Sequence, residues 1–161
     1  MLRILGIGLI TAIVSIWGES LVVRQKKRIK ALEALLRLAQ SLEAKVRSFH
    51  TPVRSILCGY KDELLEASGF LELAVFGMSF AEAARQKADE LCLDVSDVLL
   101  LSEFGDGLGQ YSVDEELKRC AYYTGELKRR LDTARSKLPG EVKLFRSAGI
   151  MCGILAAVFL I

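Results

Sequence analysis

The glycine-rich stretch EFGDGLG, residues 103–109, is the first candidate for chemistry in this chain of 161 residues. Such loops bind phosphate when glycines spaced G-x-G-x-x-G join a β-strand to a helix, or when a Gly-Lys-Ser/Thr sequence is present. Neither condition holds, because the preceding residues have a helical pattern and Gly105, Gly107 and Gly109 are spaced differently. The stretch is therefore predicted to be a turn, with Gly105 ending a helix in the left-handed conformation and the other two glycines forming a tight connection.

Metal and nucleophile chemistry have few candidates. Cys58, Cys92, Cys120 and Cys152 are widely separated, without the close spacing of a zinc site or a redox motif. They are expected to be free thiols that pack as small hydrophobic side chains. His50 is the only histidine of the sequence and is expected to lie in a turn.

The acidic side chains are densest between residues 89 and 103. They are Asp89, Glu90, Asp94, Asp97 and Glu103. Their spacing is more typical of exposed helix and turn positions than of a catalytic carboxylate pair. The net charge of +2 is too small to indicate a nucleic-acid partner. We therefore expect no enzyme activity, no cofactor, no metal and no nucleic acid.

The N-terminal end has the composition of a membrane anchor. Residues 4–23, ILGIGLITAIVSIWGESLVV, contain one charge, Glu19, and can cross a hydrocarbon core of roughly 30 Å as a helix. A cleaved signal peptide is the alternative, but no A-x-A site follows. Glu19 is expected either to pair with Arg24 at the membrane interface or to have a role within the membrane. Retention is favoured by the basic block that follows the apolar segment: Arg24, Lys26, Lys27, Arg28 and Lys30.

The C-terminal end repeats this pattern. Residues 147–161, SAGIMCGILAAVFLI, are uncharged and follow basic residues, which predicts a short membrane helix beginning near Leu144, or else a buried hydrophobic tail helix. The positive-inside rule places the middle of the chain in the cytoplasm. We therefore predict an N-terminal transmembrane helix over 1–23, a cytoplasmic helical bundle over 24–143 and a C-terminal transmembrane helix over 144–161.

The first half of the middle region has helical periodicity. Between 29 and 49, apolar residues recur at steps of three and four, which predicts a helix continuous with the first anchor. Thr51 and Pro52 are a helix opening, with a hydroxyl cap followed by a proline at the first position. The next helix is predicted to run to Ser68. The charged side of the first helix is expected in solvent; it carries Arg28, Lys30, Glu33, Arg37 and Lys45.

Two capping boxes organise the second half. Ser79 and Glu82 open a helix that is predicted to reach about Cys92. A further helix is predicted from about 96 to 104 and is expected to be buried on most sides. Ser112 and Glu115 then open a long helix that ends where residues 139–140, Pro-Gly, bend the chain. The basic side chains of this helix are expected to face solvent, with docking to an acidic partner or a membrane as the alternative; they include Lys128, Arg129, Arg130 and Arg135.

At this point the sequence resembles the stage III sporulation protein AB family of endospore-forming bacteria. The resemblance covers nearly the whole chain. Its motifs follow in order between the two apolar ends: residues 5–6 (Leu-Gly), 42–44 (Leu-Glu-Ala), 50–52 (His-Thr-Pro), 103–105 (Glu-Phe-Gly) and 108–109 (Leu-Gly).

The resemblance implies a fold and a set of partners. It implies an antiparallel helical bundle similar to the F protein of type II secretion, placed between two terminal transmembrane helices. It also implies a place in the channel complex between mother cell and forespore, next to the stage III sporulation protein AA ATPase and other membrane subunits. Assembly into a homo-oligomer is a further expectation from secretion platforms.

We weigh three functions. The first, which the resemblance implies, is a non-enzymatic platform or adaptor in the membrane around the forespore, which couples the partner ATPase to the channel. The second is a membrane-surface module that binds anionic lipid through its two basic clusters. The third, an enzyme, is the least favoured, because no group of residues has the spacing of a catalytic site.

Overall fold

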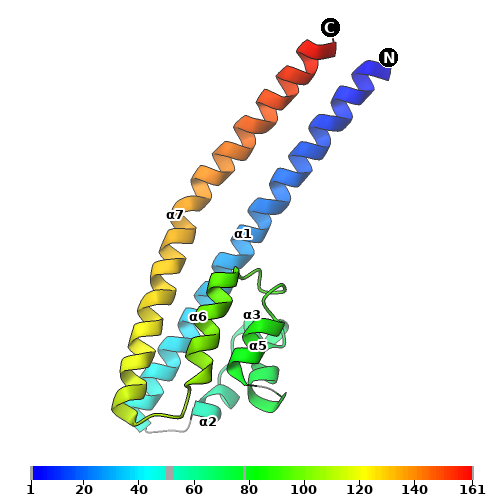
Figure 1. Cartoon of the computed structure of the whole chain (residues 1–161). Helices are drawn as coiled ribbons and strands as arrows, with labels where there is room; N and C mark the ends of the chain where they lie inside the picture. The colour runs from blue at the N-terminus through cyan, green and yellow to red at the C-terminus, as the bar shows by residue number, and fades with distance from the viewer. Residues whose placement is uncertain (1, 50–52, 78, 161) are drawn as a thin grey trace. The chain divides into compact units, whose positions relative to one another are not determined.

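A computed structural model describes the backbone of residues 2–49, 53–77 and 79–160, and side chains over 20–47, 55–76, 79–144, 147–148 and 151. Every element in these ranges is helical, which confirms the all-α prediction for the described part of the chain (Figure 1). The elements are α1 (Leu2–Phe49), α2 (Val53–Cys58), α3 (Glu63–Ala67), α4 (Phe70–Glu72), η1 (Leu73–Gly77, a π-helical turn), α5 (Phe80–Gln86), α6 (Val95–Asp106) and α7 (Val113–Leu160).

The chain divides into two compact units. One consists of residues 1–26 and 133–161, and the other of residues 27–132. Across the residues whose side chains are described, no helix is both long and apolar enough to cross a membrane. The predicted anchors, including Glu19, lie largely outside these residues, since side chains are not described for 1–19 or for most positions beyond 144.

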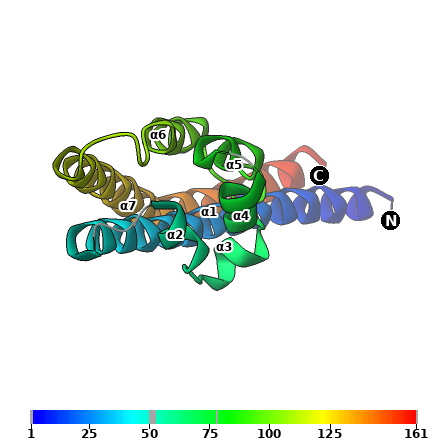
Figure 2. The same ribbon diagram turned by 90° about the horizontal axis from the view of Figure 1, so that it is seen from below.

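Helix α1 is the central helix of the 27–132 unit. Its predicted continuity through residue 49 is confirmed. Its buried surface is wider than one stripe. Ala31, Ala34, Leu35 and Leu38 are buried in addition to most of the predicted apolar positions whose side chains are described, which are Ile29, Leu32, Ala39, Leu42 and Val46. Figure 2 shows neighbours on more than one side of α1, with α5 and α6 on one side in this view and α3 on the other.

The segment after α1 is more broken than predicted. In place of one helix ending near Ser68, α2 stops at Cys58 and α3 starts at Glu63. Asp62 causes the break, because its Oδ1 accepts the amides of Leu64 (3.2 Å) and Leu65 (3.3 Å) and so caps a new helix. Gly69 then takes the left-handed conformation, with φ of 69°, before α4 begins.

Asp62 also bonds to the side of α1. The guanidinium of Arg37 donates to Asp62 Oδ2 at 2.7 Å from Nη2 and 3.2 Å from Nε. Desolvation alone would raise the pKa of Asp62, but the bonds from Arg37 and from the α3 amides outweigh it and lower that pKa below its usual value. Arg37, predicted to be only solvated, therefore joins α1 to the start of α3.

Two further predicted boundaries are wrong. Helix α5 ends at Gln86 instead of near Cys92, and the following turns bury Leu91 and Leu93. Helix α7 continues through Pro139 instead of ending there. Pro139 is exposed, and its ring is accommodated inside the helix.

Aromatic rings connect the short helices to α6 and α7. Phe70 meets Phe80 edge-to-face, with centroids 5.2 Å apart, and Phe80 meets Phe104 at 5.7 Å. Phe104 in turn lies 5.0 Å from Tyr123 of α7. Aromatic pairs at these separations stabilise a core beyond their buried area. The chain of rings fixes α4, α5, α6 and α7 against one another.

Candidate functional site

The most strongly constrained polar group described in the structure is the carboxylate of Asp97. Its side chain is fully buried, with 0% exposure, in the first turn of α6. Arg28 of α1 donates from Nε to Asp97 Oδ2 at 2.8 Å, and Arg130 of α7 donates from Nη1 to Oδ1 at 3.0 Å. One carboxylate therefore binds both long helices to α6.

Each member of this group has a second interaction. Arg28 reaches Asp94 at 2.6 Å, and Arg130 Nε lies 3.5 Å from Glu126 Oε1 as an ion pair. The amide of Asp94 donates to Asp97 Oδ2 at 3.2 Å, which satisfies an otherwise unpaired amide at the start of α6. We call these five residues the Asp97 cluster. A buried carboxylate is tolerated only with such partners on both oxygens.

The Asp97 cluster corrects three sequence predictions. Asp97 was expected to be exposed, and Arg28 and Arg130 were expected to face solvent or an external partner. The structure instead buries the acid and turns both arginine side chains inward, leaving them 16% and 22% exposed. An unpaired buried carboxylate would be costly, and among the described residues Arg28 and Arg130 are the cations that reach Asp97. Both arginines therefore turn toward it.

The other predicted contact residues do lie at the surface. On α1, Arg24, Lys26, Lys27 and Lys30 are exposed. On α7, the predicted contact residues Lys128, Arg129 and Arg135 are exposed.

Arg129, one of these exposed cations, is paired within its own helix. Arg129 donates Nε to Glu126 Oε2 at 3.0 Å. This bond lowers the pKa of Glu126 and raises the pKa of Arg129. The basic face of α7 is thus partly neutralised by its own helix.

The glycine-rich stretch is positioned differently from its prediction. Helix α6 continues through Gly105 to Asp106, and the left-handed residue is Gly109, with φ of 77°, not Gly105. Gly105 is required for packing, because a Cβ there would lie 2.7 Å from the amide nitrogen of Ala81 and 2.8 Å from the ring of Phe80. Only glycine allows α5 to approach α6 this closely.

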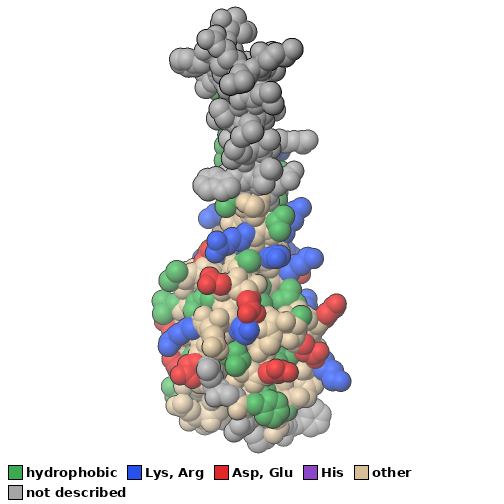
Figure 3. Space-filling model, turned by 90° about the vertical axis from the view of Figure 1, so that its right-hand side faces the viewer, with side chains coloured by type: hydrophobic (Ala, Val, Ile, Leu, Met, Phe, Trp, Pro, Cys, Tyr) green, Lys and Arg blue, Asp and Glu red, His purple; other side chains and the backbone are tan. Residues whose placement is uncertain are grey.

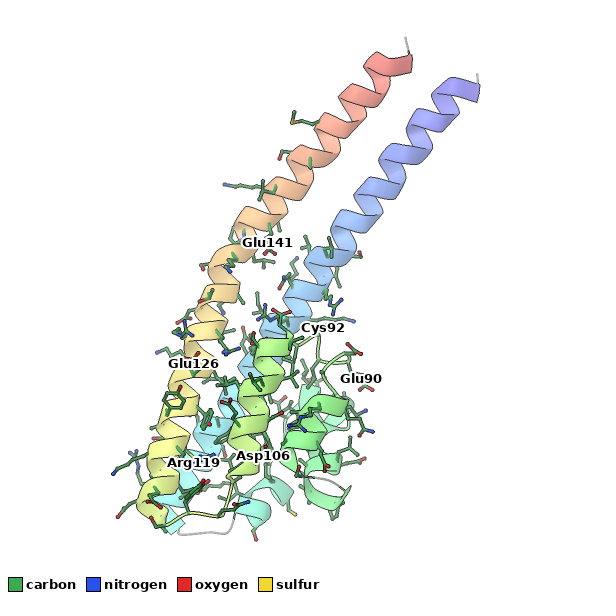
Figure 4. The ribbon with its side chains drawn as sticks, in the orientation of Figure 1. Glu90, Cys92, Asp106, Arg119, Glu126 and Glu141 are labelled. Atoms are coloured by element: carbon green, nitrogen blue, oxygen red, sulfur yellow. The ribbon has the colours of Figure 1, made fainter. Side chains whose placement is uncertain are left out.

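Gly107 makes room for a cation from the same chain. The guanidinium of Arg119, on α7, occupies the space that a Cβ at Gly107 would need. Its Nη2 donates to the carbonyl of Glu103 at 3.0 Å, at the C-terminal end of α6, beside the Asp106 labelled in Figure 4. The same guanidinium lies over the ring of Tyr111, 4.8 Å from its centroid.

This geometry disfavours phosphate at the stretch. The C-terminal end of a helix presents carbonyl oxygens and a partial negative charge, which attract a cation and repel an anion. Arg119 satisfies that charge from within the chain. The stretch is a helix end held by an arginine.

The predicted caps are positioned as follows. Ser79 accepts the amide of Glu82 at 3.2 Å, and the Glu82 carboxylate accepts the Ser79 amide at 3.2 Å, which is a complete capping box. Ser112 Oγ donates to Glu115 Oε2 at 3.2 Å just before α7. Thr51 and Pro52 lie outside the described residues.

The cysteines have no metal or disulfide partner in the described part of the chain. Cys58, Cys92 and Cys120 are free thiols, and no cluster there could hold a metal ion. Burial, with a smaller contribution from the nearby carboxylate of Glu116, raises the pKa of the Cys120 thiol to about 11. The side chain of Cys152 lies outside the described residues.

These observations define a protein whose described elements are helical and whose buried carboxylate, Asp97, joins three helices to one another. The sequence comparison identifies the group to which it belongs: the chain is a member of the stage III sporulation protein AB family, which matches residues 3–161. Membership implies a role in stage III of sporulation. No curated protein matches the chain, and no solved structure does.

Proposed function

We propose that this protein is a non-enzymatic inner-membrane platform of the channel complex between mother cell and forespore. In this role it couples a secretion-type ATPase, the stage III sporulation protein AA, to the membrane subunits of the channel. The fold proposed for residues 24–143 is the bundle of the type II secretion F protein. The family match over nearly the whole chain supports this role.

The proposed topology follows from the two ends of the chain. Residues 1–23 and 144–161 are apolar and adjoin basic residues, as membrane anchors do. We propose that they span the membrane around the forespore and that residues 24–143 lie in the cytoplasm, where an ATPase can reach them.

The Asp97 cluster is the single structural observation that supports coupling. Helices α1 and α7 are the elements that contain the apolar ends, and α6 is bonded to both at Arg28 and Arg130. A partner that displaces α6 therefore acts on two helices through one buried carboxylate. A surface loop without such bonds would absorb the displacement instead.

The test is binding of the full chain, in a mild detergent, to the ATPase from the same organism. The proposed contact is the exposed basic face of α7, so Lys128→Glu with Arg135→Glu should weaken binding at least about tenfold. Lys61→Glu is the matched control, since Lys61 is also exposed but lies between α2 and α3. Unchanged binding and unchanged sporulation in the double variant would refute this contact surface.

A second function is supported by the exposed basic residues of α1. Arg24, Lys26, Lys27 and Lys30 are all exposed within seven residues of one helix, a pattern that attracts anionic lipid headgroups. In that case the full chain should prefer anionic over zwitterionic vesicles, and raised salt should abolish the preference. Retained preference after replacing these four residues by glutamine would exclude the lipid function.

A further inference from the structure

The outer face of α6 has an unusual apolar pair. Val95 and Leu99 lie one helical turn apart, with 88% and 60% of their surfaces exposed. The sequence predicted that α6 would be buried on most sides, and this face is the exception. Single exposed apolar residues need no explanation, but a pair on one helix face marks a candidate contact.

Acidic side chains border this pair. Glu103 and Asp106 continue the same exposed stripe of α6, at the positions one and two turns beyond Leu99. Asp89 and Glu90 are exposed just before the helix. An anionic membrane surface would be repelled by these carboxylates, which favours a partner with an apolar centre and a basic border.

The chain contains a surface with those properties on α7. Tyr122 is 65% exposed, and beside it Ala121 and Gly125 are exposed small residues that leave its ring accessible. Lys118 and Lys128 border this group on the two sides along the helix, and both are exposed. On the side of the molecule drawn in Figure 3, acidic, basic and hydrophobic side chains are interspersed.

We propose that the outer face of α6 binds the outer face of α7 of a second copy of this chain. Leu99 then packs on Tyr122 and the small residues beside it, while Glu103 and Asp106 pair with the lysines. Contact between two α6 faces would instead bring carboxylates together, which is unfavourable. The contact shares Lys128 with the proposed ATPase surface, but self-association is measured with neither ATPase nor lipid present, so the two proposals are tested separately.

The test uses charge exchange between two versions of the full chain in one mild detergent. The first version carries Glu103→Lys and Asp106→Lys. The second carries Lys118→Glu and Lys128→Glu. Added lysines suit the C-terminal end of α6, so the first version is expected to fold, and circular dichroism checks both.

Each version alone should self-associate at least about tenfold more weakly than the wild type in sedimentation equilibrium, and mixing the two should restore association. Leu99→Ser should weaken association, whereas Phe76→Ser, at the 82% exposed Phe76 of η1, should not. Association that is unchanged in both charge versions would overturn the proposal. The proposal would also be overturned if both charge versions associated more weakly and mixing them did not restore association, which would indicate a different partner for α6.

Discussion

Replacing Asp97 by asparagine tests whether the Asp97 cluster holds the helices together. The substitution preserves volume but removes the charge that two guanidinium groups share. Breaking a buried ion pair typically costs about 3–5 kcal/mol, because the remaining charge is left uncompensated. The side chains of Arg28 and Arg130 are only 16% and 22% exposed, so water can replace little of what is lost.

Two features reduce the expected loss. Arg28 keeps its contact to Asp94 at 2.6 Å, and Arg130 keeps its weaker ion pair with Glu126 at 3.5 Å. We therefore expect Asp97→Asn to lower the free energy of unfolding by about 2–4 kcal/mol. With a urea dependence of about 2 kcal/mol per molar, the unfolding midpoint falls by about 1–2 M.

The measurement is urea unfolding of the full chain, followed by circular dichroism in one detergent throughout. Asp94→Asn is the matched control, because the Asp94 side chain is 57% exposed and also pairs with Arg28, yet an exposed pair contributes only about 0–1 kcal/mol. Arg28→Lys should lower the free energy of unfolding by an amount between those of the two aspartate variants, since an ammonium cannot reach both carboxylates as the guanidinium does. If Asp97→Asn and Asp94→Asn lowered the free energy of unfolding equally, the stabilising role assigned to the buried Asp97 carboxylate would be refuted.

Three further predictions concern packing, reactivity and pH. Gly105→Ala should lower the free energy of unfolding by about 1–3 kcal/mol, because the added Cβ clashes with α5. Gly125→Ala should raise it by about 0.5–1 kcal/mol, because a Cβ at this exposed position of α7 meets nothing within 4 Å. Urea unfolding midpoints measure both changes. Alkylation followed by mass spectrometry at pH 8 should modify exposed Cys58 rapidly and leave Cys120 intact until the chain unfolds, because its pKa is about 11. The pKa of Asp62 is lowered in the fold, so its bond to Arg37 stabilises the fold fully above the unfolded-state pKa of about 3.9. This stabilisation is lost as the pH falls through the lower folded-state pKa. Asp62→Asn should therefore reduce stability at pH 7 and make stability depend less on pH in the acid range.

Local patterns were sufficient to predict much of the fold. The apolar steps of α1 and the Ser79–Glu82 box depend on residues within one or two turns, and both appear in the structure. The break at Asp62 was also local, since an aspartate before Glu63 and Leu64 is a cap signal. It was missed because the apolar pattern on both sides suggested one continuous helix.

The Asp97 cluster could not be predicted in the same way. Its hydrogen bonds join residues separated by 69 and 33 positions along the chain, so no periodicity contains them. The one available signal was the Asp94-x-x-Asp97 spacing of a capping box, which explains the amide bond but not the burial. Gly105 is similar, because its need for glycine comes from the approach of α5 and not from its own backbone angles.

The two ends of α6 are held by the same physical device. At its N-terminal turn a buried carboxylate receives arginines from α1 and α7, and at its C-terminal end the carbonyl of Glu103 receives Arg119 of α7. Anions at the start of a helix and cations at its end both lower the energy of the helix dipole, so each bond stabilises α6 and attaches it at once. A helix attached at both ends moves only with its neighbours. The proposed platform role needs this property if a contact on one helix is to reach the helices that contain the apolar ends of the chain.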